Sequence, residues 1–285
     1  MSNCGRQLRG LKMNYDFFDY KYNIFGYSGQ DFESVIRILY LIISIFLLPV
    51  LAEMTRKKGI KTAERIFRFL SIYLIIEEIF KISWESYWDI TTGHGFNAGG
   101  ILPLDTCSIF LYVLPIAAFG KGKAKRCALS WMSTIGVLGG ISYLIFPMVL
   151  KWYPLFTFGA WHSLMYHFVM VYAGFTVIST NMLEVKRTDY LLGFIPHMLM
   201  ALIVIPFDYH FGWDYMLLRN ASGVPFVENL ASKLSAMNLN YLTTVIMLGF
   251  YLVIAMLFNF ININIQKKLN DHDYVHHKHE LKYTN

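Results

Sequence analysis

Long apolar runs separated by short polar segments dominate the chain. The runs cover about residues 34–52, 66–87, 102–119, 127–150, 159–180, 190–207 and 239–261. A helix rises ~1.5 Å per residue, so apolar runs of roughly 17–25 residues are long enough to cross the hydrocarbon core of a bilayer. The pattern therefore predicts an all-α, polytopic membrane protein with about seven transmembrane helices.

The polar segments between these runs differ in charge, which predicts how the chain is oriented. Lys and Arg concentrate after the first, third, fifth and seventh runs, whereas residues 89–101 contain neither. Cytoplasmic loops carry an excess of Lys and Arg, so we expect the N-terminus outside and the C-terminus in the cytoplasm. Three regions follow: an interfacial outer arm (1–33), a transmembrane domain (34–261) and a cytoplasmic, polar, His-rich tail (262–285).

Composition supports a multi-pass protein of the cell membrane. Hydrophobic residues make up 55% of the chain and charged residues 15%, and the mean hydropathy is +0.42. The net charge of +6 is spread over the loops that flank the apolar runs, which favours membrane lipids rather than nucleic acid as partners. The three cysteines do not indicate a disulfide framework, and no zinc spacing or phosphate-binding loop predicts a metal or cofactor. The sequence does not indicate an oligomeric state.

Polar side chains from four of the apolar runs fall at similar depths in the outer half of the predicted bundle. At ~1.5 Å per residue, Cys107 lies roughly 8 Å and His167 about 10–13 Å below the outer boundary. Ionisable groups at such depths cost at least ~2.5–3.5 kcal/mol each, so they are candidates for function. The other candidates in the predicted spans are Glu77, Glu78, Lys81, His162 and His197.

Each candidate also has a structural explanation. Glu77 and Glu78 precede Lys81 by four and three residues, a spacing that allows a salt bridge along one helix face. His167 would equally hydrogen-bond a neighbouring helix, and Cys107 alone is a small, apolar core residue.

Cys107 and His167 together indicate covalent chemistry. A Cys nucleophile needs a nearby base to form the thiolate, which attacks an ester carbonyl and yields an acyl-enzyme. Asp105, Glu78 and Lys81 would orient or tune this pair. Arg219, in the outer segment after residue 207, would contact a phosphate headgroup or serve only as a loop cation.

The chain also resembles the YwaF-like membrane proteins of bacteria, relatives of eukaryotic transmembrane protein 164. The matching motifs are Glu77-x3-Lys81-x2-Trp84, Leu102-Pro103-Leu104-x2-Cys107, Phe146-Pro147, His162-Ser163-Leu164-x-Tyr166-His167 and Asp214-Tyr215-Met216. The resemblance implies a seven-helix fold and a phospholipid acyltransferase with a Cys/His centre, which corresponds to Cys107 and His167. At Asp105 the family pattern would have a His.

These observations predict a lipid acyltransferase or transacylase with Cys107 and His167 as its catalytic residues. Two alternatives stay open. In a permease or transporter component, the intramembrane Glu, Lys and His would form a substrate or proton path. The second alternative is a lipid-binding membrane protein without turnover.

Overall fold

Helices make up all the regular structure in the part of the chain that the computed structural model describes, residues 15–22, 24, 27–222 and 225–283. The main helices are α2 (Val35–Lys58), α3 (Ile60–Thr91), α5 (Ile109–Phe119), α6 (Gly122–Trp131), α7 (Val137–Ile145), α8 (Phe158–Ser179), α9 (Asp189–Phe211) and α11 (Asn240–Tyr283). A π-helical turn, η1 (Met132–Gly136), joins α6 to α7. The shorter elements are α1 (Gln30–Glu33), α4 (Ala98–Ile101), η2 (Met148–Lys151), η3 (Tyr215–Leu217) and α10 (Pro225–Ala236). The predicted all-α class is confirmed.

Several of these helices have the length and composition of membrane spans. In the described residues, four helical stretches are long and apolar enough to cross a bilayer, and α5 is a shorter apolar helix. The four stretches are Val35–Lys58, Gly122–Lys151, Asp189–Phe211 and Asn240–Asp271. All seven predicted segments contain helix, although the number of crossings and the outward N-terminus stay predictions.

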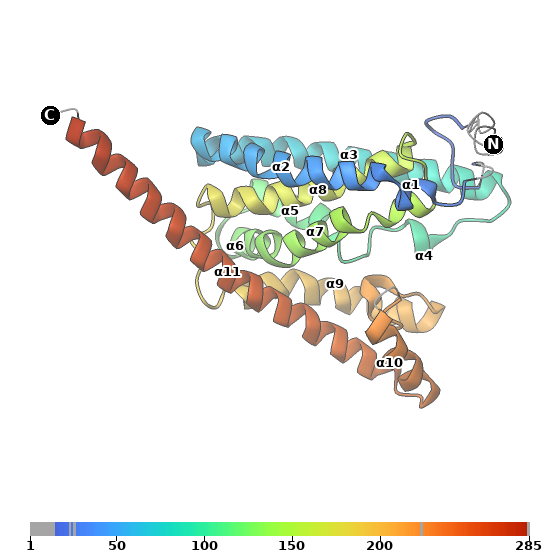
Figure 1. Cartoon of the computed structure of the whole chain (residues 1–285). Helices are drawn as coiled ribbons and strands as arrows, with labels where there is room; N and C mark the ends of the chain where they lie inside the picture. Colours follow the sequence, from blue (N-terminus) through green and yellow to red (C-terminus); the bar gives the residue numbers. More distant parts are fainter. Residues whose placement is uncertain (1–14, 23, 25–26, 223–224, 284–285) are drawn as a thin grey trace, which may run out of the picture.

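The helices form a bundle whose connections gather at two ends (Figure 1). Helices α2, α3 and α8 lie along one side, α5 to α7 lie in the middle, and α11 crosses obliquely beside α9. One end holds the Lys- and Arg-rich connections around residues 56–65, 121–126 and 186–187, and we call it the basic end. The other holds α4, η3 and the described N-terminal arm (residues 15–33, with 23, 25 and 26 outside the description), and we call it the arm end.

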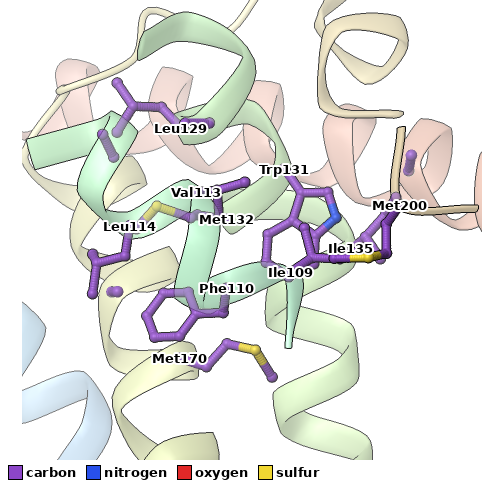
Figure 2. Close-up of a cluster of buried hydrophobic side chains, with 14 of the residues drawn as sticks. Ile109, Phe110, Val113, Leu114, Leu129, Trp131, Met132, Ile135, Met170 and Met200 are labelled. Carbon is purple, nitrogen blue, oxygen red and sulfur yellow. The ribbon is translucent and has the colours of Figure 1, made fainter. Parts of the chain in front are cut away.

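An apolar core occupies the middle of the bundle (Figure 2). Phe110 and Leu114 of α5 pack with Met132 and Met170, and all four side chains are almost fully buried. Small residues let the backbones approach closely. A Cβ atom added at Gly140 of α7 would contact the Val171 side chain of α8, so glycine sets the spacing of these helices.

The stretch from Leu102 to Ser108 is not helical, so the predicted start of the third segment at residue 102 is wrong by seven residues. Pro103 disfavours helical backbone at the preceding residue. Tyrosine side chains from other elements donate to three carbonyl groups of this stretch: Tyr215 to that of Leu102, Tyr112 to that of Pro103, and Tyr166 to that of Cys107. We call this stretch the Cys107 loop.

Candidate functional site

A cavity of about 180 Å³ opens at the arm end beside the Cys107 loop. Helices α3 and α8 supply most of its ionisable groups, and the loop supplies its thiol. The lining residues are Glu78, Lys81, Trp84, Glu85, Gly100, Leu102, Pro103, Asp105, Cys107, Ser108, Val149, Tyr153, Gly159, His162, Ser163, Tyr166 and His167. The predicted residues Cys107, His167, Asp105, Glu78, Lys81 and His162 are therefore brought together around one space.

Lys81 is the centre of a charged cluster on α3. Its Nζ lies 3.3 Å from Glu78 Oε1 and 3.2 Å from Glu85 Oε2. It also donates a hydrogen bond of 3.3 Å to the carbonyl oxygen of Ile101, directly before the Cys107 loop. Its ammonium group donates hydrogen bonds to Glu78 and Ile101, whereas Glu85 faces it as an ion pair without a hydrogen bond. Lys81 thus links α3 to the loop.

His162 connects α8 to the same cluster through two carboxylates. Its Nδ1 lies 3.4 Å from Glu77 Oε1, and its Nε2 lies 3.5 Å from Glu78 Oε2. Both ring nitrogens therefore face acids. A His in this arrangement neutralises buried carboxylates and has no nitrogen directed at a thiol.

His167, five residues further along α8, contacts a backbone carbonyl and an aromatic ring instead of carboxylates. Its Nδ1 lies 2.7 Å from the carbonyl oxygen of Ser163, and its ring stacks on Tyr143 with centroids 3.6 Å apart and planes 7° apart. A carbonyl oxygen only accepts hydrogen bonds, so Nδ1 carries the proton and Nε2 keeps its lone pair. His167 is thereby held in the tautomer that a general base requires.

Cys107 lies between the polar cavity and the apolar core. Its side chain lines the cavity and also packs against the core cluster. Its carbonyl oxygen accepts a hydrogen bond of 3.1 Å from Tyr166 Oη. The described part of the chain has no hydrogen bond between this thiol and His167, so the two groups share a cavity without direct contact. A buried thiol in apolar surroundings stays protonated until a base takes its proton.

The Cys107 loop is held from the opposite side by residues late in the chain. Asp105 Oδ1 accepts a hydrogen bond of 3.4 Å from the backbone N–H of Met216. Thr106 Oγ1 donates to Tyr251 Oη at 3.1 Å, and Tyr251 Oη donates to the carbonyl oxygen of Met216 at 3.1 Å. Asp105 therefore both lines the cavity and attaches the loop to the outer segment.

Three residues that the sequence singled out do not line the cavity. Glu77 is linked to the cavity only through its contact with His162. His197 is fully buried on α9 with its ring 4.1 Å from that of Tyr251, and within the described residues neither ring nitrogen has a hydrogen-bond partner. Arg219 Nη1 donates to the carbonyl oxygen of Gly212 at 3.0 Å.

Sequence reasoning missed part of the cavity wall. Glu85 follows Lys81 by four residues, and this helical spacing was a usable signal. Tyr166, which also lines the cavity, and Tyr143, which lies behind His167 and does not, had no such spacing, because their roles depend on contacts with the Cys107 loop and with His167.

The N-terminal arm packs over residues of the cavity wall. The carbonyl oxygen of Phe18 accepts a hydrogen bond of 2.9 Å from Trp84 Nε1, and that of Phe17 accepts one of 2.6 Å from the Phe158 N–H. Tyr20 is 1% exposed, with its ring 5.2 Å from that of Trp84. Burial raises the pKa of the Tyr20 phenol, and the nearby carboxylates raise it further, so this hydroxyl is a neutral donor. The arm is thus attached to the cavity wall at Trp84.

Within the described residues, no group of three or more His, Cys, Asp or Glu side chains forms a possible metal site.

Residues 27–252 match the model of the TMEM164 family. This segment includes every residue of the cavity wall. No curated protein and no solved structure matches the chain.

Proposed function

The chain belongs to the TMEM164 family of membrane proteins, and from this premise we propose that it is a membrane-embedded lipid acyltransferase or transacylase. One observation carries the proposal: Cys107 and a tautomer-fixed His167 line the same cavity in the arm-end half of an apolar bundle. An ester-bearing lipid would reach this site from the surrounding membrane. The predicted orientation places that half of the bundle in the outer leaflet.

The proposed reaction has two balanced steps. His167 Nε2 accepts the Cys107 proton, and the thiolate attacks the ester carbonyl of a donor lipid. The carbon–oxygen ester bond breaks, the lysolipid alkoxide takes the proton from His167, and the acyl group remains on sulfur as a thioester. In the second step a hydroxyl group of an acceptor lipid gives its proton to His167 and attacks the thioester; the carbon–sulfur bond breaks, and the Cys107 thiolate takes the proton back from His167 to restore the thiol.

The charged cluster supports this chemistry by positioning the loop. Lys81 reaches the Ile101 carbonyl just before the loop, and Asp105 accepts from Met216 just before the thiol. Because Lys81 donates hydrogen bonds to Glu78 and to the Ile101 carbonyl and pairs with Glu85, we assign it a positioning role rather than substrate contact. Arg219 stays a candidate for a headgroup at the arm end.

The same geometry supports a permease less well than an acyltransferase. Such a protein needs a polar path from one face to the other. Beyond Cys107 and His167 towards the basic end, α5 and α8 instead supply Phe110, Leu114 and Met170, which belong to the buried apolar core (Figure 2).

The acyl-enzyme itself provides the test. Purified protein is incubated with a phospholipid donor without acceptor, and the intact mass and cysteine peptides are measured. We expect an added acyl mass on Cys107 that hydroxylamine removes. Cys127, the other described free cysteine, is an internal control in the same digest. Cys107→Ser abolishes acyl transfer while the variant keeps the wild-type melting temperature.

Acyl transfer that persists in Cys107→Ser would overturn the nucleophile assignment. Absence of both adduct and transfer across phospholipid classes, from a protein that melts cooperatively, would overturn the enzyme proposal.

A further inference from the structure

We propose that the groove between α5, α6 and α9 holds the acyl chain that is transferred through Cys107. This inference rests on the proposed acyl transfer for the identity of its occupant. It adds a second binding region to the polar cavity, on the other side of the Cys107 loop.

The groove has the size and lining of a site for an alkyl chain. Its volume is about 440 Å³, within the range of roughly 300–1,000 Å³ typical of small-ligand sites. Apart from the Cys127 thiol and the Tyr112 hydroxyl, its lining side chains are hydrocarbon or thioether groups. The lining residues are Leu104, Ile109, Tyr112, Val113, Ile116, Ala124, Cys127, Ala128, Ile195, Pro196, Leu199, Met200 and Ile203.

The groove begins at the reactive loop. Leu104 of the loop and Ile109, two residues after Cys107, both line it. Cys107 itself packs against the core cluster that contains Ile109, Val113 and Met200, and these three side chains form the inner wall of the groove (Figure 2). The Cys107 loop thus borders both spaces, and in this proposal an acyl group on the sulfur passes the loop near Leu104 to enter the groove.

One hydrogen bond fixes the wall between the two spaces. Tyr112, which lines the groove, donates at 3.0 Å to the carbonyl oxygen of Pro103, which lines the polar cavity. The wall thus separates a polar space for the ester from an apolar space for its chain. The ester is held in the polar cavity beside Cys107 and His167, whereas its chain is directed along α5 towards the basic end.

A second apolar cavity, of about 320 Å³, does not fit the same occupant. Its walls come from α2, η1, α7, α8 and α11, and it includes Glu53 and Asn262. Glu53 lies three residues before Arg56, the first of the basic residues that end α2, and the lining contains no residue of the Cys107 loop. An acyl group on Cys107 would have to cross the buried core to reach it.

A matched pair of leucines on α9 tests the groove. Leu199 lines it, whereas Leu202 lines none of the three cavities, and the two side chains are 57% and 63% exposed. Leu199→Trp fills the groove midway and Leu202→Trp adds the same bulk outside it. Acyl transfer is measured with donors that carry 8- to 18-carbon chains. Each buried methylene contributes roughly fourfold to binding, so loss of a few of them lowers transfer of the longest chain relative to the shortest by at least about tenfold.

We expect that shift in Leu199→Trp and an unchanged chain-length profile in Leu202→Trp. Equal profiles in both variants, with transfer intact, would overturn the groove and leave the acyltransferase proposal standing.

A second measurement does not need turnover. A phospholipid with a diazirine at the end of one acyl chain, near one equivalent per protein in detergent, is photolysed with the Cys107→Ala protein, and its adducts are mapped. We expect adducts on the α5 and α9 walls that Leu199→Trp reduces and Leu202→Trp does not. Adducts spread evenly over all exposed helices overturn the groove. Adducts confined to the groove, without any thioester in the wild type, would support the groove as a site for acyl chains and overturn the proposed acyltransferase activity.

Discussion

At the scale of single residues, His162 and His167 of α8 have different environments and hence different expected roles. His162 faces the carboxylates of Glu77 and Glu78, whereas His167 donates through Nδ1 to the Ser163 carbonyl and keeps Nε2 free. The sequence favoured His167 by its predicted depth alone. The hydrogen bond to Ser163 adds the chemical reason, because it selects the tautomer.

This difference predicts opposite consequences for the same substitution. His167→Gln removes the base and lowers acyl transfer by about 100- to 10,000-fold, the usual contribution of a positioned proton-transfer group. His162→Gln removes the partner of Glu77 and leaves Glu78 paired with Lys81 alone, so it lowers the free energy of unfolding by about 3 kcal/mol, as expected when one partner of a buried ion pair is removed. Transfer assays and melting in detergent separate the two. If His162→Gln abolishes transfer at an unchanged melting temperature, the assignment of the base is wrong.

Lys81 provides a further prediction at this scale. Lys81→Met keeps much of the aliphatic stem but leaves Glu78, Glu85 and the Ile101 carbonyl without their donor. We expect a loss of stability of about 3 kcal/mol and a weakened hold on the Cys107 loop. Lys81→Arg retains the charge and restores most of the melting temperature. A melting temperature equal to wild type in Lys81→Met would show that the cluster does not stabilise the fold.

At the scale of elements, hydropathy located the helices and failed where the chain is held by distant partners. The apolar run from residue 102 predicted a helix, yet the first seven residues form a loop. Tyr166, Met216 and Tyr251 bond this loop from positions 59, 111 and 145 residues from their partners. No local pattern encodes such contacts. The candidate Cys, His and Glu side chains were still predictable, because charge and polarity in an apolar run are visible in sequence.

The contact between α7 and α8 makes a prediction about the position of His167. A Cβ atom added at Gly140 would contact Val171 and lie 3.2 Å from the His167 carbonyl oxygen, whereas one at Gly139 would lie 3.8 Å from Met170 Cε, an ordinary contact. Gly140→Ala should therefore cost about 1–3 kcal/mol by overpacking and displace His167. Gly139→Ala should be neutral or stabilising, since alanine is the better helix former. Melting curves for the two variants check this, and equal curves would contradict the close packing.

At the scale of the whole molecule, charge is arranged by end. The basic end carries the Lys- and Arg-rich connections, some of whose residues join helices: Lys125 Nζ lies 2.7 Å from Glu64 Oε1, and Arg126 Nη2 lies 2.6 Å from Asp189 Oδ2. The arm end instead holds the carboxylates, the histidines and the thiol of the cavity. The positive charges between the apolar runs indicated the first of these features. The depths of the polar residues in the apolar runs predicted the second in outline, and the fold adds that α3, α8 and the Cys107 loop enclose one cavity.

This asymmetry determines from which leaflet the protein would take its lipids. Cytoplasmic loops are rich in Lys and Arg, so the basic end is expected in the cytoplasm and the cavity in the outer leaflet. Two added cysteines test this orientation. Asn97→Cys is exposed at the arm end and Lys123→Cys at the basic end. Each is introduced into a background that carries Cys4→Ser and Cys127→Ala. A membrane-impermeant thiol reagent should label Asn97→Cys on intact cells and Lys123→Cys only after permeabilisation. The parent background sets the baseline for Cys107. The reverse labelling would invert the topology and place the acyl-transfer site in the inner leaflet, with the fold and the cavity unchanged.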